Sequence, residues 1–179
     1  MIVKILIAIA LIVLIFVAIV AMQPASYRVT RTATISAAPA AVFEQVNDLH
    51  KWNAWSPWAK IDPDMKQTYE GPPTGVGASS SWSGNSKAGE GRMTITESHP
   101  SDLVKIRLDF VRPFPSTANS EFAFVPQGDQ TTVTWAMSGE KNFMSKAFCM
   151  FVSMDKMVGG DFERGLTQLK FVSETPTKP

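Results

Sequence analysis

The feature that most constrains this chain is an alternation of apolar and polar side chains over residues 65–140. In LVKIRLDF, residues 103–110, every second side chain is apolar and most of those between are charged. A period of two is that of a β-strand with one buried face. Glycine and proline interrupt the pattern repeatedly, and PQGDQ (residues 126–130) reads as a hairpin turn between two such runs. The sequence therefore predicts an antiparallel meander with one apolar face.

An apolar sheet face is stable only when another layer covers it. The C-terminal region supplies that layer, because its apolar side chains recur three and four residues apart, as in an amphipathic helix. These side chains are Phe151, Met154, Val158, Phe162, Leu166 and Leu169. Gly159 and Gly160 lie within the pattern, and each costs about 1 kcal/mol relative to alanine inside a helix. We therefore predict a break there and a final helix over residues 160–172.

The segment before the meander predicts one strand and two short helices. Residues 27–35 alternate like a half-buried strand, although Arg31 interrupts the apolar side. Residues 39–49 then show helical spacing, and WNAWSPW follows at 52–58, where Pro57 prevents a long second helix. Of the three tryptophans, we expect Trp52 in the core, whereas Trp55 and Trp58 could equally line the mouth of a binding site.

The N-terminal stretch Ile5–Met22 holds 18 residues without a charged or strongly polar side chain. As a helix it would extend about 27 Å, close to the hydrocarbon thickness of a bilayer. It is longer than the apolar region of most signal peptides and lacks a clear cleavage site, which favours a retained anchor over a cleaved signal. Basic residues flank both ends almost equally, and we weakly favour a single-pass anchor with the domain on the non-cytoplasmic side.

Charge and side-chain chemistry narrow the function. Without Lys4, the chain's 17 basic residues leave 16 outside the anchor, equal to its 16 acidic residues, so no nucleic-acid partner is expected. Cys149 lies among apolar neighbours, and His50 and His99 lack companions at metal-ligand spacing. Neither a metal nor another cofactor is therefore expected. The serines at 79–81 have no neighbouring histidine, and no catalytic residue is assigned.

Several motifs occur in an order that resembles a known superfamily: WSPW (55–58), YEGP (69–72), GVGA (75–78), WSGN (82–85) and GDFERGL (160–166). The chain is similar to the SRPBCC superfamily, the START and birch-pollen-allergen-like group, in its polyketide cyclase/dehydrase branch. The resemblance implies an α+β helix-grip fold, in which a curved antiparallel sheet wraps around a long C-terminal helix. It covers residues 27–172, leaving an anchor at 1–22, a linker at 23–26 and a tail at 173–179.

Members of this group include lipid carriers, aromatic-ring cyclases and hormone receptors, so the resemblance implies a cavity between the sheet and the final helix. Large, adaptable apolar side chains on the inward face fit that expectation, although such residues are also common in ordinary cores. The predicted ligand-binding residues are Trp55, Trp58, Tyr69, Trp82, Met93, Phe110, Phe114, Phe124, Trp135, Met137, Met154 and Phe162.

The sequence thus predicts a membrane-anchored domain that binds a hydrophobic small molecule or lipid by burial. One alternative is a cyclase-like enzyme acting on an aromatic precursor, and another is an interaction module with a filled core. Few titratable residues could serve an enzyme. Glu70, Glu97, Glu121 and Glu140 lie at strand ends or on the polar side, where a solvated edge charge is the ordinary role. Arg31 and Arg112 could meet a ligand head group, but we favour pairing with a carboxylate on a neighbouring strand. The oligomeric state is left open.

Overall fold

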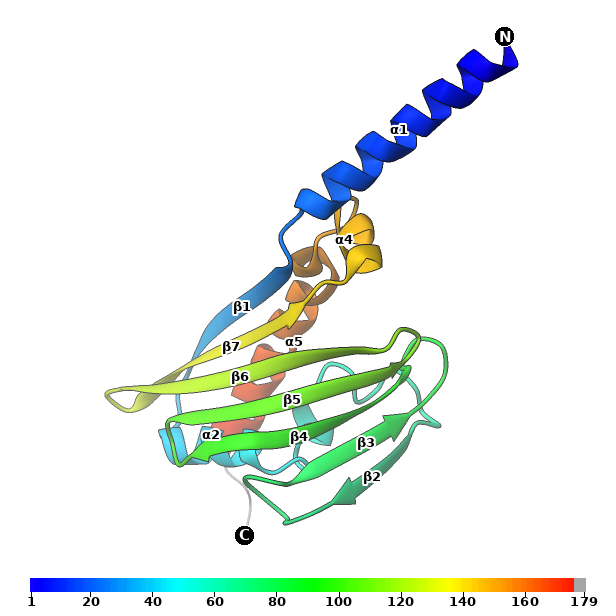
Figure 1. Ribbon diagram of the computed structural model, residues 1–179. Helices are drawn as coiled ribbons and strands as arrows, with labels where there is room; N and C mark the ends of the chain where they lie inside the picture. Colours follow the sequence, from blue (N-terminus) through cyan, green and yellow to red (C-terminus); the bar gives the residue numbers. More distant parts are fainter. Residues whose placement is uncertain (176–179) are drawn as a thin grey trace.

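The computed structural model describes residues 1–175 and consists of one antiparallel sheet, a long C-terminal helix packed against it, and a projecting N-terminal helix (Figure 1). The helices are α1 (Ile2–Met22), α2 (Pro39–Asn47), α3 (Trp52–Trp55), α4 (Phe143–Cys149) and α5 (Met154–Glu174). The strands are β1 (Ser26–Ile35), β2 (Lys66–Glu70), β3 (Ser79–Ser83), β4 (Glu90–His99), β5 (Leu103–Arg112), β6 (Ser116–Gln127) and β7 (Gln130–Glu140).

The seven strands form one sheet in the order β1-β7-β6-β5-β4-β3-β2. Strands β2 to β7 follow chain order as a meander, and β1 closes on β7, so β1 and β2 are the edges. The hairpin between β6 and β7 is where the sequence places it, with Gly128 at a φ of 63°. The α+β architecture predicted from the sequence, including two short helices after the first strand, is confirmed.

The predicted break in the C-terminal helix is wrong, because α5 is continuous from Met154 to Glu174. Gly159 has a packing role: a Cβ atom there would lie 2.2 Å from Nη2 of Arg31 on β1. Nη1 of Arg31 donates to Oδ1 of Asp155 at 2.8 Å, and its Nε donates to Oε1 of Glu163 at 2.7 Å. The partners of Arg31 are thus on α5, and not on a neighbouring strand. The absence of a side chain at Gly159 leaves the space that the guanidinium occupies beside the helix, between Asp155 and Glu163.

The core is aromatic where α3 and α5 meet β6 and β7. Trp52 and Trp55 are 5% and 1% exposed, so both belong to the core. Their indole N–H groups donate to the backbone carbonyls of Val46 and Gln45, at 2.9 and 3.0 Å. These acceptors lie at the end of α2, so the buried tryptophans also fix α3 against α2.

The N-terminal helix stands apart from the sheet (Figure 1). Among residues 1–175, α1 is the one helix long and apolar enough to cross a membrane, and Val20 is its one buried side chain. A signal sequence would meet the same criterion. The first residues of the predicted tail, 173 and 174, are helical, and residues 176–179 lie outside the described residues. The sequence analysis did not predict α4.

Candidate ligand-binding site

The space between β7 and α5 is filled, which corrects the predicted cavity. The ring of Trp135 on β7 stacks on that of Phe162 on α5, with centroids 4.1 Å apart and planes 4° from parallel. Trp135 is 2% exposed and Phe162 is fully buried. Four further rings, those of Trp52, Trp55, Trp58 and Phe122, pack edge-on or stacked against Trp135. A ligand at this level would have to displace packed rings.

The twelve predicted ligand-binding residues fall into three groups. Five are buried: Trp55, Phe124, Trp135, Met137 and Phe162. Six are half-buried: Trp58, Tyr69, Trp82, Met93, Phe110 and Met154. The remaining residue, Phe114, lies in the turn between β5 and β6 and is 79% exposed. Their contact with a ligand stays a prediction, and four of the half-buried residues, Tyr69, Trp82, Met93 and Phe110, show where the apolar face of the sheet remains partly open.

That open part is the β2–β5 side of the sheet. Trp82 pairs with Gly91, and Gly91 pairs with Phe110, so the three residues share one face. A Cβ atom on Gly91 would lie 2.5 Å from Cζ2 of Trp82. Gly91 therefore leaves room for the indole to lie across β4 and meet Phe110 edge-on, with centroids 5.9 Å apart. The indole N–H donates to the carbonyl of Ala88 at 3.2 Å, which fixes the ring's position.

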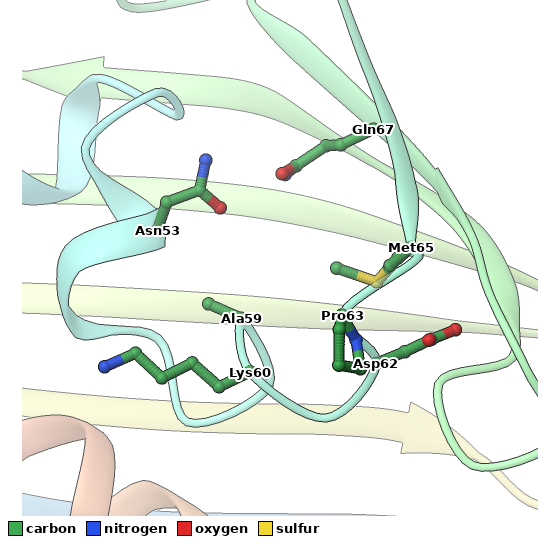
Figure 2. Close-up of a pocket in the computed structure, with 7 residues that line it drawn as sticks. All are labelled: Asn53, Ala59, Lys60, Asp62, Pro63, Met65 and Gln67. Carbon is green, nitrogen blue, oxygen red and sulfur yellow. The ribbon is translucent and has the colours of Figure 1, made fainter.

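A solvent-open hollow of about 340 Å³ lies between α3, the turns that follow it, and β2 (Figure 2). Its lining residues are Asn53, Ala59, Lys60, Asp62, Pro63, Met65 and Gln67. We call this the α3–β2 pocket. Its volume is at the lower end of the range of small-molecule sites, about 300–1,000 Å³. Aliphatic groups are mixed with the amides of Asn53 and Gln67, which point toward one another across the pocket (Figure 2), so the pocket suits a ligand with a polar end.

Hydrogen bonds hold the polar lining residues in place. Nδ2 of Asn53 donates to the hydroxyl of Tyr69 at 3.0 Å, and Nε2 of Gln67 donates to Oγ of Ser80 at 3.0 Å. Asp62 is only 8% exposed, and its carboxylate accepts from the backbone N–H groups of Asp64 and Asn85 at 3.1 and 2.6 Å. Asp62 thus ties the turn before β2 to the β3–β4 loop, which is a structural role.

Lys60 makes no ion pair with the other described residues, and its ammonium group extends away from Met65 and Gln67 at the rim of the pocket (Figure 2). A different rotamer of Lys60 would bring this group to an anionic or carbonyl oxygen on a ligand. The aromatic core begins beside the pocket. Trp58 directly precedes the lining residue Ala59 and packs edge-on against Trp135. On the other side, Met65 lies near Gly84 in the β3–β4 loop.

Sequence reasoning missed the pocket's polar residues. Asn53 lies between the tryptophans that drew attention, and Gln67 alternates normally within a strand. Only the concentration of polar residues directly after the tryptophans, in KIDPDMKQ (residues 60–67), could have indicated them.

A second hollow of about 260 Å³ lies beside Tyr69, near the C-terminal end of α2. Its lining includes His50, Tyr69, Glu70 and Ser79. The His50 ring stacks on Tyr69 with centroids 4.0 Å apart, and its Nδ1 lies 3.0 Å from Oδ1 of Asp48. Tyr69 therefore stands between the two hollows and stabilises both walls.

Besides Arg31, four of the charged residues considered as candidates are engaged in ion pairs. Glu70 pairs with Arg92, Glu97 with Lys105, Glu121 with Arg28, and Arg112 with Glu90, at 2.7–3.2 Å. The hydrogen bond from Lys105 holds the pKa of Glu97 below its ordinary value, and in return raises the pKa of Lys105. A lowered pKa keeps a carboxylate charged and makes it a weaker base.

A curved antiparallel sheet that grips one long helix, with two short helices after the first strand, defines a helix-grip domain. The chain belongs to the family described as "Polyketide cyclase / dehydrase and lipid transport", whose model matches residues 26–174. The resemblance found in the sequence is thereby confirmed. That description supports binding of hydrophobic ligands at a coarse level and specifies neither a substrate nor a reaction.

Solved structures share the fold at low sequence identity. Protein MLL2253 from Mesorhizobium loti has a TM-score of 0.60 at 15% identity, covering 84% of this chain and 100% of its own. The Aha1 dimer from Colwellia psychrerythraea has a TM-score of 0.59 at 15% identity, covering 85% and 99%. The protein Ara h 8.0201 has a TM-score of 0.54 at 10% identity, covering 83% and 95%. No match was found among curated proteins.

Proposed function

We propose that this protein is a membrane-anchored domain that binds an amphiphilic small molecule or lipid at the α3–β2 pocket, by burial and without covalent chemistry. The observation that carries the proposal is the pocket itself, a hollow of about 340 Å³ into which the amides of Asn53 and Gln67 point, with Trp58 next to its lining residue Ala59. The ligand's apolar part would lie toward Trp58 or toward Trp82 and Phe110. Its polar end would meet Lys60, Asn53 or Gln67.

The family description, which names lipid transport, supports a hydrophobic ligand. The length and apolarity of α1 support an anchor that holds the domain at a membrane. Holding the pocket beside a bilayer raises the local concentration of any compound that partitions there. A bilayer component is therefore the ligand class we favour.

Native mass spectrometry of the full chain, extracted in mild detergent, tests the pocket. The Ala59→Trp variant fills the pocket with an indole, and should lose a co-purified ligand that the unmodified chain retains. Ala54→Trp is the matched control, because Ala54 is exposed on α3 and does not line the pocket. Lipids that adhere to α1 should be the same in all three proteins. Equal ligand content in the two tryptophan variants would refute binding at this pocket.

A second candidate is an interaction module, which the filled core between β7 and α5 favours. In that case no ligand would co-purify with the unmodified chain, apart from the lipids that adhere to α1. The same mass spectra therefore separate the two candidates.

A further inference from the structure

The helix α4 and the turn after it expose an unusual number of large apolar side chains. Met144 is 74% exposed, Phe148 54% and Phe151 78%, and their spacing of four and three residues places them on one face. Three more exposed apolar side chains, Phe143, Met150 and Met157, belong to the same segment or to the first turn of α5. We call these six residues the α4 patch. Single exposed apolar residues are ordinary, but a concentration like this one indicates an interaction surface.

The α4 patch lies directly at the base of α1 (Figure 1). Nζ of Lys146 donates to the carbonyl of Ala21, in the last turn of α1, at 3.3 Å. A carbonyl in that turn has no partner within its own helix, and a cation there also complements the helix dipole. The contact therefore fixes α4 at the level where the apolar span of α1 ends.

The charges around the patch suit a membrane surface. Residues 141–153 include two lysines and no acidic side chain. Two carboxylates flank this segment along the chain: Glu140 directly precedes Lys141, and Asp155, two residues after Ser153, is paired with Arg31. Apolar side chains with lysines beside them are the composition of helices that lie in the bilayer interface. The aliphatic stem of a lysine can lie along the apolar layer while its ammonium group reaches the headgroups.

Outside the α4 patch, a further exposed ring lies at the end of the sheet where β7 leads into α4. The last residues of β7, which lead to α4, pair with the first residues of β6, as in Gly139 with Ala118. The turn just before β6 carries Phe114, which is 79% exposed. A membrane surface in contact with the α4 patch would therefore also lie near Phe114. Trp82 and Phe110 are half-buried at this same end of the sheet.

We propose that the α4 patch inserts into the lipid headgroup and upper acyl region of the bilayer that α1 spans. The inference rests on α1 being a membrane anchor, as stated under the proposed function, and it is independent of the identity of the ligand. Docking at two places, α1 and α4, fixes the orientation of the domain on the membrane. It also directs the end of the sheet that carries Phe114 toward the lipid.

Full-length protein in vesicles of phosphatidylcholine and phosphatidylglycerol tests the inference. In a Cys149→Ala background, single cysteines replace Met144 or Phe151 and carry an environment-sensitive fluorophore. Lipids with a nitroxide near the headgroup should quench most of the emission from both positions. Val125→Cys is the matched control, because Val125 is also exposed and apolar (53%) but lies beside the β6–β7 hairpin, at the opposite end of the sheet. Its label should stay unquenched.

A further label at Ile12, within α1, separates the two proposals, using lipids with the nitroxide deep in the acyl chain. Quenching at Ile12 without quenching at Met144 and Phe151 would overturn docking of the patch and leave the anchor intact. No quenching at Ile12 would overturn the anchor itself, and the docking with it. If a second copy of the chain covered the patch, Phe151→Cys would form concentration-dependent disulfide dimers and its label would resist lipid quenching. Adding Met144→Asp to the Phe151 reporter should reduce its quenching, because a charge opposes insertion.

Discussion

The same substitution at two glycines of α5 should change stability in opposite directions. Gly160 is exposed, and a Cβ atom there would meet only Nη1 of Arg164, at an ordinary 3.7 Å. Gly165 is buried, and a Cβ atom there would lie 2.7 Å from Cζ3 of Trp135 and 3.1 Å from Cδ of Pro57. The indole of Trp135 has little freedom to retreat, because it stacks on Phe162 and donates to Oγ of Ser120 at 2.8 Å.

The magnitudes follow from two effects. Replacing glycine by alanine within a helix stabilises it by about 1 kcal/mol, and this gain is common to both positions. Overpacking a well-filled core typically costs about 1–3 kcal/mol, and this cost applies to Gly165 alone. Gly160→Ala should therefore raise the free energy of unfolding by about 1 kcal/mol. Gly165→Ala should lower it by up to about 2 kcal/mol, so the two variants should differ by about 1–3 kcal/mol.

Denaturant unfolding of the full chain in detergent micelles, followed by tryptophan fluorescence, measures both values under the same conditions. The unmodified protein is the reference, and the slope of the transition should not change between variants. An equal gain at the two positions would refute the reasoning. It would mean that the Trp135 ring does not pack tightly against α5. The cavity predicted between the sheet and the final helix would then exist at this level.

Three further predictions concern α5 and its contacts. Gly159→Ala should stabilise less than Gly160→Ala because its Cβ displaces Arg31, and in an Arg31→Ala background the two should become equal by the same unfolding assay. The hydrogen bond from Arg31 lowers the pKa of Asp155 in the folded protein. The stability that this ion pair contributes is therefore fully present above the ordinary pKa of 3.8, and it is lost as the pH falls through the lower pKa of the folded state. Asp155→Asn should therefore be less stable than the unmodified protein at neutral pH, with the difference vanishing in acid; a constant difference at all pH values would contradict the pairing. Phe162→Ala should cost about 3–5 kcal/mol in unfolding free energy, and a loss below about 1 kcal/mol would contradict close packing there.

The elements of the fold were predictable because they depend on local patterns. A period of two, interrupted by glycine and proline, is sufficient to identify the strands of the meander and the Gly128 turn. Two errors in the C-terminal region came from the same local reasoning. The pair Gly159–Gly160 predicts a break only if nothing compensates for it, and Arg31, more than 120 residues earlier, supplies that compensation through Asp155 and Glu163. The apolar face of α4 was missed because its segment is too short to show a helical period.

The candidate site was less predictable than the fold. Half of the predicted ligand-binding residues are half-buried, but the polar residues that line the α3–β2 pocket, among them Asn53, Lys60 and Gln67, did not belong to the prediction. A polar residue in a pocket and one on an ordinary surface look the same in a sequence. The two differ only in which residues from other segments of the chain surround them in the folded structure.

The sequence alone determined the family, the order of the strands, the helices other than α4, and the apolar N-terminal span, since the motifs and periodic patterns behind them are each local in the chain. The tertiary structure decided where space remains. Trp58, Trp135 and Phe162 come from three separated segments, and only their meeting fills the room between β7 and α5 and leaves the hollow beside α3 open. The physical reason is that the volume of a cavity is the difference between the space that the backbone encloses and the volume of side chains from distant segments, a quantity that no local pattern contains.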